Sequence, residues 1–569
     1  METPMTPLEF MRRTRRLYPD KEAVVDENQR LTYEQFFDRC DRWSAALQQL
    51  GVRKGDRVAY IAPNTHAQLE SFYAVPQLGA VLVPINYRLT ADDFAYIIAH
   101  SGASVVCAHS DYLEAVDGIR DQIPGVRHFV ALEGARDGWI TYEETLAATA
   151  PRFERPEIAE SDLLTINYTS GTTSRPKGVM ITHRNAYINT VGTLVHIPMT
   201  PGDVYLWTLP MFHANGWTYV WTVTAVGARH ICLRRVEPAR IFPAIAAEGV
   251  TMLCAAPTVL IAIGNAPAEV RAGALATATA TATAANGQEP AAAKGGWFRR
   301  KEPVHNGQPA QAGQNGATRP HQIVRVITAG APPAAATIER IEGELGWEIT
   351  QVYGLTETSP FITVCEPRPE HAALGPAERA TIKARQGVEL ITSGELIVAD
   401  SELREVPHDG QTLGEIVVRG NAVMQGYYND PEATAKAFAG GWFHSGDAAV
   451  VHPDGYVEIR DRIKDVIISG GENISSIEVE GALLRHPAVQ EVAVVGMADE
   501  RWGEAPHAFV VLKSGARADE DELRQFARAN MAHFKVPKEF HFVAELPKTA
   551  TGKIQKFVLR GGRSAIATQ

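Results

Sequence analysis

Cysteine is scarce in this sequence and follows no motif. Five cysteines occur in 569 residues, and none belongs to a CxxC pair of the kind that binds zinc or to a closely spaced disulfide framework. They are Cys40, Cys107, Cys232, Cys254 and Cys365. We therefore expect reduced, buried thiols and a cytoplasmic protein, since disulfides are rare in that compartment.

Long hydrophobic runs and an excess of positive charge are also missing. No stretch approaches the roughly 20 consecutive apolar residues of a membrane-spanning helix, and the N-terminus has no apolar signal-peptide core. The formal net charge is -11, whereas a nucleic-acid-binding domain usually carries a basic stripe. We expect neither a transmembrane segment nor a nucleic-acid partner, which favours small-molecule chemistry.

The composition is that of a large globular protein, with 45% hydrophobic and 21% charged residues. Between Arg57 and Ala329, short runs rich in β-branched residues alternate with helix-length segments rich in Ala, Leu and Glu. The runs are "RVAYIAP", "GAVLVPIN", "ASVVCAH", "LLTINYT", "RHICL", "VTMLCAAP" and "IVRVITAG". Such alternation predicts an α/β fold with mostly parallel sheets, whose apolar strands are covered by helices on both faces.

Two changes of composition divide the chain. Residues 273–320 alternate Ala with Thr and continue with Gly, Gln, Asn and Pro; this segment has little apolar surface to offset the entropy of ordering, so we interpret it as a disordered insertion. A second change lies near 462–465, after which a helix–strand–strand–helix pattern predicts a small separate unit. We expect a large N-terminal domain, residues 1–463, and a smaller α+β C-terminal domain, residues 464–569.

A loop rich in hydroxyls follows a predicted strand at Asn167–Val179, "NYTSGTTSRPKGV". Backbone amides, hydroxyls and the cations Arg175 and Lys177 suit a polyphosphate. A Walker loop is excluded, because that motif needs Gly before its Lys and a hydroxyl residue after it, whereas Pro176 precedes Lys177 and Gly178 follows. Composition alone leaves phosphate binding and an ordinary polar turn as open alternatives.

Further motifs follow this loop in a fixed order. They are "PMFHANGW" (Pro210–Trp217), "YGLTE" (Tyr353–Glu357), "GWFHSGD" (Gly441–Asp447), "RDRIKDVIISGGENIS" (Arg460–Ser475) and "PKTATGKIQK" (Pro547–Lys556). In content and order the six motifs resemble the adenylate-forming, AMP-binding superfamily of acyl-CoA synthetases, amino-acid adenylation domains and luciferases. "MFHANGW" and "ISGGENISSIEVE" are most similar to fatty-acyl and related CoA ligases.

The resemblance implies a two-step reaction with the active site between a large domain and a mobile C-terminal domain. A carboxylate first attacks the α-phosphate of ATP, which releases pyrophosphate and leaves an acyl-adenylate. The C-terminal domain then rotates, and a thiol such as that of CoA displaces AMP. Mg²⁺ is the implied cofactor, with ATP and CoA as co-substrates.

The resemblance also assigns roles to residues of each motif. Those implied to bind the ATP phosphates are Thr169, Ser170, Gly171, Thr172, Thr173, Lys177 and Thr356. Those implied to bind adenine and ribose are Gly330, Ala331, Tyr353, Asp447 and Arg462. The remaining ones are Lys553 as catalytic lysine, His213 as a catalytic gate, Glu357 as magnesium ligand, Lys464 as hinge, and Gly470 and Gly471 as lining of the CoA channel.

Elementary chemistry agrees with these assignments. A mobile cation such as Lys553 suits the charge that develops between carboxylate and α-phosphate. Mg²⁺ binds one or two carboxylates together with phosphate oxygens, as Glu357 allows. The carboxylate acceptor Asp447 and the forked donor Arg462 suit ribose hydroxyls. Each residue also has an ordinary interpretation, such as a solvated lysine, a surface glutamate or a packed His213.

The sequence therefore predicts an AMP-forming carboxylic acid–CoA ligase acting on a fatty acid of medium or longer chain. The alternatives are an adenylating enzyme that stops at acyl-adenylate or loads a carrier protein, and a CoA ligase for a short-chain or aromatic acid. A non-catalytic binding module would be expected to lack Lys553 or Glu357. Few residues follow Arg560, so no fused carrier domain is expected. A homodimer is compatible with the sequence.

The missing charges restrict the acid. Segments 206–224 and 326–338 contain no Asp, Glu, Lys or Arg, so a pocket lined by them offers no partner for a second charge on the substrate. Amino-acid adenylation domains carry an Asp where His213 follows Phe212. We expect uncharged alkyl or aryl acids, while Trp207, Trp217 and Trp221 either close the pocket or pack behind it.

Overall fold

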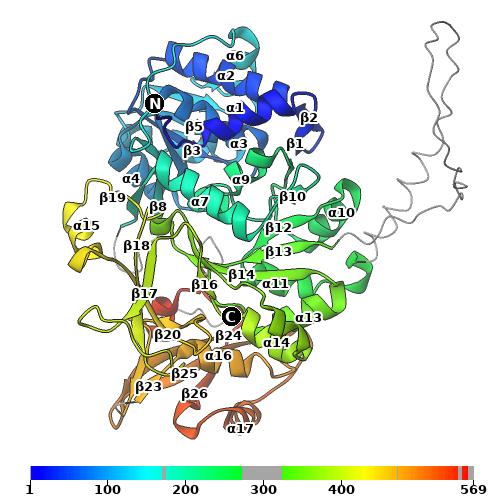
Figure 1. The fold of residues 1–569 in the computed structure, drawn as a ribbon, viewed down its shortest axis with the longest axis vertical. Helices are drawn as coiled ribbons and strands as arrows, with labels where there is room; N and C mark the ends of the chain where they lie inside the picture. Colours follow the sequence, from blue (N-terminus) through cyan, green and yellow to red (C-terminus); the bar gives the residue numbers. More distant parts are fainter. Residues whose placement is uncertain (1, 170–174, 272–322, 471, 549–553, 562–569) are drawn as a thin grey trace, which may run out of the picture.

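The computed structural model describes residues 2–169, 175–271, 323–470, 472–548 and 554–561. Two large sheets dominate this part of the chain (Figure 1). The first has the strand order β16 (Val388–Glu389), β15 (Phe361–Val364), β14 (Glu348–Gly354), β13 (Arg325–Thr328), β12 (Met252–Ala255), β10 (Val204–Leu206), β11 (Arg229–Cys232), β1 (Glu22–Asp26) and β2 (Gln29–Thr32). From β14 through β1 its neighbours are parallel, and β2, β15 and β16 add antiparallel edges.

The second large sheet is likewise mostly parallel. Its order is β19 (Gly426–Tyr427), β9 (Lys177–Thr182), β8 (Leu163–Thr169), β4 (Val81–Ile85), β3 (Arg57–Ile61), β5 (Ala103–Ala108), β6 (His128–Ala131) and β7 (Ile140–Thr141). Each apolar run quoted from the sequence forms a strand of one of these two sheets, which confirms the α/β prediction.

Helices cover both faces of the sheets, and alternate strand residues enter different cores. In β3, Val58 and Tyr60 join the core between the two sheets, whereas Ala59 and Ile61 join the core on the outer face. The helices of this part are α1 (Leu8–Leu17), α2 (Tyr33–Gln49), α3 (His66–Ala74), α4 (Ala91–Ser101), α5 (Leu113–Asp117), α6 (Tyr142–Ala148), α7 (His183–His196), α8 (Ala214–Trp217), α9 (Tyr219–Val226), α10 (Pro238–Glu248), α11 (Pro257–Gly264), α13 (Ala335–Leu345) and α14 (Pro376–Lys383).

Capping residues fix where several helices begin. Thr32 starts α2 with a capping box, in which its hydroxyl accepts from the backbone of Gln35 and the Gln35 side chain accepts in return. Thr182 and Asn185 form the same reciprocal pair at α7. Such boxes satisfy amide donors that the first helical turn leaves unpaired, so the hydroxyl at each strand-to-helix junction sets the helix start.

Two smaller sheets follow along the chain. One contains β17 (Glu395–Ala399), β18 (Gly414–Arg419), β20 (Phe443–Val451) and β21 (Val457–Arg462), with α15 (Pro431–Ala437) beside it. The other contains β23 (Glu472–Ile474), β22 (Ile467–Ser469), β25 (Gly503–Leu512) and β24 (Val489–Asp499), with β26 (Glu539–Phe542) on β25; its helices are α16 (Ser476–Leu483), α17 (Glu520–Asn530) and α18 (Lys556–Arg560).

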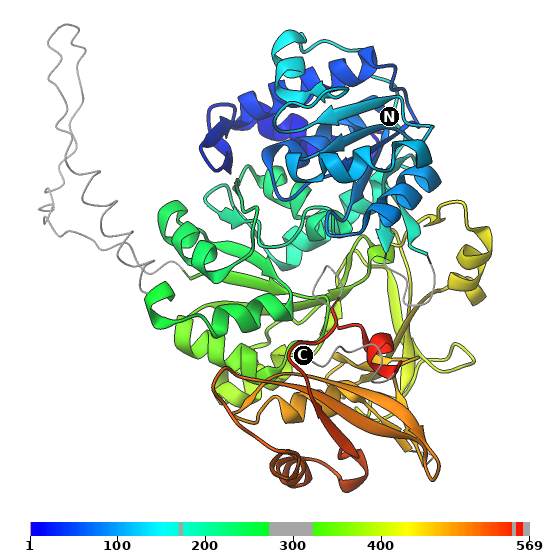
Figure 2. The same cartoon turned by 180° about the vertical axis from the view of Figure 1, so that it is seen from behind.

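The last sheet has cores of its own on both faces. Val494, Val510 and Leu523 belong to the core under α16 and α17, while Val495 and Leu559 belong to the core on the opposite face. Figure 2 shows this orange and red part of the chain at one end of the molecule, below the two large sheets. The predicted boundary at 463–464 stays a prediction, as does the insertion 273–320, which lies outside the described residues.

In the described part of the chain, none of the helices has the length and apolar character needed to cross a membrane.

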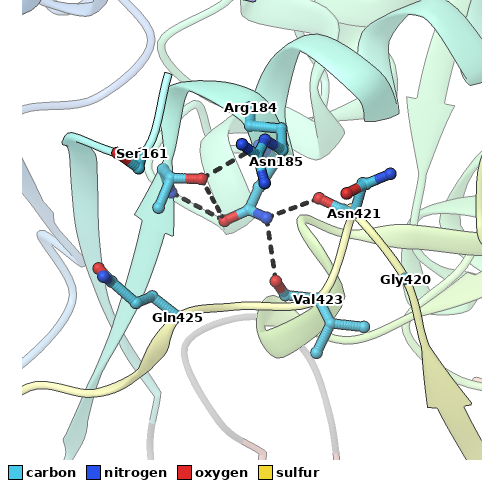
Figure 3. Close-up of a pocket in the computed structure, with 8 residues that line it drawn as sticks. Ser161, Arg184, Asn185, Gly420, Asn421, Val423 and Gln425 are labelled. Carbon is cyan, nitrogen blue, oxygen red and sulfur yellow. Dashed lines mark hydrogen bonds between the residues drawn. The ribbon is translucent and has the colours of Figure 1, made fainter. Parts of the chain in front are cut away.

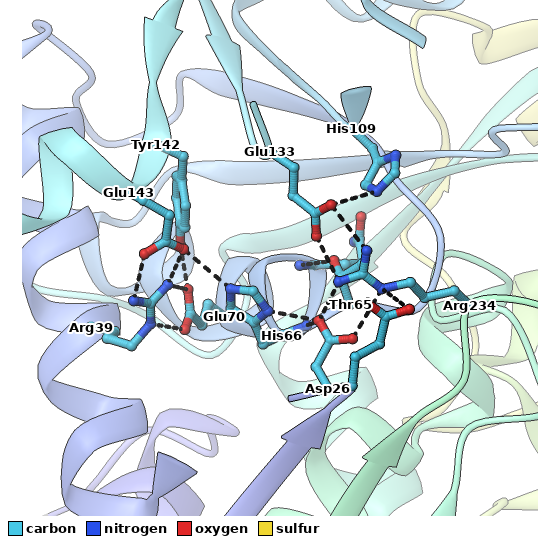
Figure 4. A network of polar contacts seen from close by, with 12 residues as sticks. Asp26, Arg39, Thr65, His66, Glu70, His109, Glu133, Tyr142, Glu143 and Arg234 are labelled. Atoms are coloured by element: carbon cyan, nitrogen blue, oxygen red, sulfur yellow. Dashed lines mark hydrogen bonds and ion pairs between the residues drawn. The ribbon is translucent and has the colours of Figure 1, made fainter. Parts of the chain in front are cut away.

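A buried network of charges joins the two large sheets (Figure 4). Asp26, at the end of β1, accepts from Nδ1 of His66 at 2.7 Å and from Nε of Arg234 at 3.1 Å. Arg234 also pairs with Glu133, which follows β6, and His66 contacts Glu143 at 3.2 Å. Elements of one sheet are thereby tied to elements of the other.

The network shifts two pKa values. Burial acts to raise the pKa of Asp26, but the hydrogen bonds from His66 and Arg234 outweigh burial and lower it to about 2. Burial acts to lower the pKa of His66, but Asp26 and Glu143 outweigh burial and raise it to about 9. His66 is therefore a buried imidazolium at neutral pH.

We predict that this pair makes the free energy of unfolding depend on pH. The raised pKa of His66 gives stability that is complete below its ordinary value of 6.5 and is lost as pH rises through about 9. The lowered pKa of Asp26 gives stability that is complete above its ordinary value of 3.8 and is lost as pH falls through about 2. His66→Gln should flatten the decline on the alkaline side in urea unfolding measured from neutral to alkaline pH. The exposed His408→Gln is the control, and an unchanged decline in His66→Gln would contradict the prediction.

Candidate active site

The hydroxyl-rich loop connects two strands of a hairpin. Thr169 ends β8 and pairs with Lys177, the first residue of β9. Ser170, Gly171, Thr172 and Thr173 lie outside the described residues, so their predicted roles stay predictions. The hairpin places both flanking residues, Thr169 and Lys177, at the same edge of the second sheet.

A tyrosine joins this edge to the predicted magnesium ligand. The ammonium of Lys177 lies 4.9 Å from the ring centroid of Tyr427, and the Tyr427 hydroxyl donates to Oε1 of Glu357 at 2.9 Å. β19 brings Tyr427 there because it pairs antiparallel with β9. Burial, followed by the Glu357 carboxylate, raises the pKa of Tyr427, so its hydroxyl remains a donor.

Sequence reasoning missed Tyr427. The stretch "GYYNDPEAT" contains a visible helix start, since Asp430 caps α15 and Pro431 occupies its first position. That signal locates a turn and a helix, but the role of the tyrosine depends on strand pairing with a distant part of the chain. The repeated Tyr427–Tyr428 pair before the turn was the available clue.

A second cluster forms where the first large sheet meets the sheet of β20 and β21. The Tyr353 hydroxyl donates to Oδ2 of Asp447 at 2.7 Å, and Nε of Arg462 lies 2.8 Å from Oδ1 of Asp447. Asp447 and Arg462 are direct partners in the β20–β21 hairpin. The Asp447 side chain is 5% exposed and that of Arg462 is 40% exposed. The carboxylate is therefore held in the protein interior, and the guanidinium that pairs with it reaches solvent.

Other predicted nucleotide-binding residues lie near the ends of neighbouring strands. β13 and β14 are parallel and in register at Thr328 and Gln351, so Gly330 and Tyr353, two residues further along the chain in each case, lie at the same edge of the sheet. Ala331 follows Gly330 and is exposed. Thr356 begins the short 3₁₀ helix η4 (Thr356–Thr358) directly before Glu357. Carboxyl ends of parallel strands are where ligands bind in open α/β sheets.

His213 precedes a run of left-handed backbone. Ala214, Asn215, Gly216, Trp217 and Thr218 have φ values of 38°, 48°, 55°, 51° and 66°. Most L-residues avoid this region, at a cost of roughly 1–2 kcal/mol each. Strained backbone of this kind gathers at ligand sites, where the surrounding structure must hold it in place.

Buried amides hold this turn. Nδ2 of Asn167 donates to the Phe212 carbonyl at 3.1 Å and to Oδ1 of Asn215 at 3.1 Å. Nδ2 of Asn215 donates to the Thr165 hydroxyl at 2.9 Å. Asn167 and Thr165 lie on β8, the strand that leads into the hydroxyl-rich loop. One strand therefore positions both that loop and the backbone around His213.

The AMP-binding enzyme family model matches residues 11–428, and the AMP-binding enzyme C-terminal domain model matches residues 478–553. The chain belongs to the AMP-binding enzyme family of adenylate-forming CoA ligases. The predicted family is thus confirmed, and the enzyme is an acid–thiol ligase.

Several relatives align over nearly the whole chain. Acetate–CoA ligase CCL3 of Humulus lupulus is 40% identical, with 98% of this chain and 94% of that protein covered. 4-Hydroxybutyrate–CoA ligase 2 of Metallosphaera sedula is 39% identical, covering 99% and 96%. The peroxisomal trans-cinnamate:CoA ligase of Petunia hybrida is 36% identical, covering 98% and 94%. The crystal structure of the anthranilate CoA ligase AuaEII shares the fold, with a TM-score of 0.81, 23% identity, and 99% and 98% coverage.

The charge-free segment 206–224 of this AMP-binding enzyme is largely buried. Trp207 and Trp221 are fully buried and Trp217 is nearly so. Trp207 packs behind the left-handed turn, because a Cβ on Gly216 would lie 2.5 Å from its ring. Its indole also donates to His230 at 3.2 Å, and burial lowers the pKa of His230 to about 3, so this region carries no charge.

The link between the last two sheets contains the predicted hinge. Lys464 is exposed between β21 and β22, and its carbonyl accepts from Arg560 of α18 at 3.3 Å. Gly470 has φ +60°, and a Cβ there would lie 2.7 Å from the Trp502 ring. In this arrangement Trp502 occupies the space that Gly470 leaves. Gly471 and Lys553 lie outside the described residues.

A hollow of about 230 Å³ lies beside the candidate site rather than in it (Figure 3). Asn185, at the start of α7, crosses the hollow and donates to the carbonyls of Asn421 and Val423 at 2.6 and 2.9 Å. The next residue, Met424, donates its backbone N–H to the carbonyl of Glu357 at 2.8 Å. Asn185 therefore supports the loop that positions Glu357.

We predict that Asn167→Ala loosens the turn at His213. The substitution leaves the Phe212 carbonyl and the Asn215 side chain without a buried donor, which should lower the free energy of unfolding by about 1–3 kcal/mol. It should raise KM for the acid more than KM for ATP, because the turn belongs to the charge-free segment 206–224. Urea unfolding and steady-state kinetics measure both effects. The exposed Asn530→Ala serves as control, and an equal rise of both KM values would contradict a role at the acid side.

Proposed function

We propose that this AMP-binding enzyme converts a short-chain monocarboxylic acid without a second charge into its acyl-CoA, through an acyl-adenylate. One observation carries the proposal: Lys177, Tyr427 and Glu357 converge at one edge, and Tyr353, Asp447 and Arg462 form a second polar cluster at strand ends. A cation with a carboxylate suits a polyphosphate, and a carboxylate with a guanidinium suits ribose hydroxyls.

The first step joins the acid to AMP. A carboxylate oxygen forms a bond to the α-phosphorus of ATP, and the bond from that phosphorus to the bridging oxygen breaks, so pyrophosphate leaves with the electron pair. Lys177 and the predicted loop residues would hold the outer phosphates, and Thr356 the α-phosphate. Asp447 and Arg462 would hold the ribose while Tyr353, Gly330 and Ala331 flank adenine.

Mg²⁺ is part of the proposal, and Glu357 suits it. A carboxylate is the hard oxygen ligand that Mg²⁺ prefers. Tyr427 fixes one oxygen of Glu357, and within the described ranges no Lys, Arg or His forms an ion pair with this carboxylate. Bound there, the ion would neutralise phosphate charge during adenylation.

The second step replaces AMP by a thiol. The CoA sulfur would bond to the acyl carbon as the bond to the AMP oxygen breaks. We propose Lys464 as the hinge between a domain of residues 1–463 and one of residues 464–569, with Gly470 and Gly471 along the thiol path and His213 as its gate. The enzyme is proposed to act in the cytoplasm, which its five buried free cysteines support. A homodimer stays a prediction.

Two features favour a short acid. The names of two relatives specify the short acids acetate and 4-hydroxybutyrate, although a third specifies the aromatic acid trans-cinnamate. The buried ring of Trp207 also lies directly behind Gly216, three residues after His213. The second candidate is the fatty acid of medium or longer chain expected from the sequence, which the absence of charge in 206–224 and 326–338 equally accommodates.

We predict that Lys553→Ala slows adenylation. If Lys553 stabilises the charge that develops at the α-phosphate, its loss should slow pyrophosphate release by about 100- to 1,000-fold. ATP binding should change little, because the interaction belongs to the transition state. Lys548→Ala is the matched control, since Lys548 pairs with Glu491 at 2.7 Å. Near-normal exchange of pyrophosphate into ATP by Lys553→Ala would contradict the assignment.

We predict that kcat/KM first rises and then falls with chain length within the short acids. Each buried methylene should add up to ~0.8 kcal/mol to transition-state binding until the pocket ends. kcat/KM measured from acetate to palmitate, with benzoate, phenylalanine and succinate alongside, should peak near butyrate. Trp207→Phe should move the peak to longer acids. Trp221→Phe should leave the peak where it is, because Trp221 packs against Phe72. A rise up to palmitate would favour the second candidate, and preference for phenylalanine or succinate would contradict both.

A further inference from the structure

Two histidines and a glutamate meet on the last sheet, away from the candidate active site. β25 and β26 are parallel neighbours, with His507 opposite Glu539 and Phe509 opposite His541. Side chains two residues apart in a strand share a face. His507, Glu539 and His541 therefore lie on one face of this strand pair, and none of them belongs to a sequence motif quoted above.

The three ligand atoms form a compact triangle. Nδ1 of His507 lies 3.1 Å from Nε2 of His541, and Oε2 of Glu539 lies 3.9 Å from the first nitrogen and 3.7 Å from the second. The nearest point equidistant from all three lies in their plane, about 2.1 Å from each atom, as these three separations require. Zn²⁺ bonds to imidazole nitrogen at about 2.0–2.1 Å and to carboxylate oxygen at about 2.0–2.2 Å.

The surroundings hold the triangle in place. The ring of His541 stacks on Phe509 with centroids 4.6 Å apart, and the two imidazoles lie 5.4 Å apart at 21°. The histidine side chains are 12% and 20% exposed, and that of Glu539 is 51% exposed. One side of the triangle thus reaches solvent, where water can complete a coordination shell. Ligands on paired strands are held more firmly than ligands on loops.

We propose that His507, Glu539 and His541 bind one Zn²⁺ ion, with water as the remaining ligand. Imidazole nitrogen suits zinc, whereas Mg²⁺ prefers oxygen ligands, so this site differs from the one proposed at Glu357. Without metal, one imidazole donates to the other. Both of these nitrogens must offer a lone pair to the ion, so the neutral imidazole that donated in the hydrogen bond then carries its proton on its other ring nitrogen.

The bound ion would tie the edge strand β26 to β25. β26 leads through Val543, whose N–H donates to the Val510 carbonyl at 3.0 Å, toward Leu546 in the core on the same face. Residues 549–553, which include Lys553, follow in the sequence. Because the metal binds the folded arrangement only, it should raise the melting temperature of this part of the chain.

The test uses the full chain without an affinity tag, stripped of metal by EDTA. Calorimetric titration with Zn²⁺ should give one ion per chain. Co²⁺ should give the visible absorption of a four-coordinate site with nitrogen and oxygen ligands. Removing one ligand, in His541→Ala or in the more exposed Glu539→Gln, should weaken Zn²⁺ binding at least about tenfold and abolish the rise in melting temperature.

His408→Ala is the matched control, because His408 also contacts a carboxylate, Glu405 at 3.0 Å, but belongs to no such triangle. It should bind Zn²⁺ as the unaltered chain does. If His541→Ala fails to fold by circular dichroism, Glu539→Gln carries the test. Unchanged stoichiometry and affinity in the ligand variants, or no saturable binding by the unaltered chain, would overturn the proposal. Pyrophosphate exchange should be the same in all the variants, since none of these residues belongs to the proposed catalytic site.

Discussion

The carboxylate of Asp447 holds the candidate site together. It accepts from the hydroxyl of Tyr353 on one large sheet and pairs with Arg462 on the adjacent hairpin. Burial, followed by the charge of Asp447, raises the pKa of Tyr353, so the hydroxyl stays protonated and continues to donate. A single nearly buried charge therefore orients an aromatic ring and a guanidinium that come from different sheets.

The rest of the site depends on similar links between distant segments. Tyr427 connects Lys177 to Glu357, and Asn167 connects the strand before the loop to the backbone after His213. Lys177 contacts the ring of Tyr427, whereas Tyr427–Glu357 and Asn167–Phe212 are hydrogen bonds whose loss leaves a polar group unsatisfied. The network of Asp26 and His66 likewise links the two large sheets by hydrogen bonds between distant segments. In the candidate site and between the two large sheets, polar contacts therefore add to the packing of the apolar cores.

Local patterns in the sequence predicted the local structure. Runs such as "RVAYIAP" form strands because β-branched residues and burial on both faces favour them. Tyr353, Asp447 and Arg462 were named from short motifs, and the structure brings them together. Tyr427 could not be named, because its position results from the pairing of β19 with β9. The triangle of His507, Glu539 and His541 could not be predicted either, because it depends on the register of two strands that a helix separates in the sequence.

The close packing of Gly216 on Trp207 makes these two positions evolutionarily dependent on each other. A side chain at 216 would strike a buried ring, and φ of +55° already excludes most residues. A lineage that enlarges position 216 needs a smaller residue at 207 beforehand, together with a side chain that tolerates left-handed backbone. In the reverse order, the intermediate would be selected against before the second change could compensate. Position 207 can therefore change while Gly216 stays, whereas position 216 cannot change while Trp207 stays.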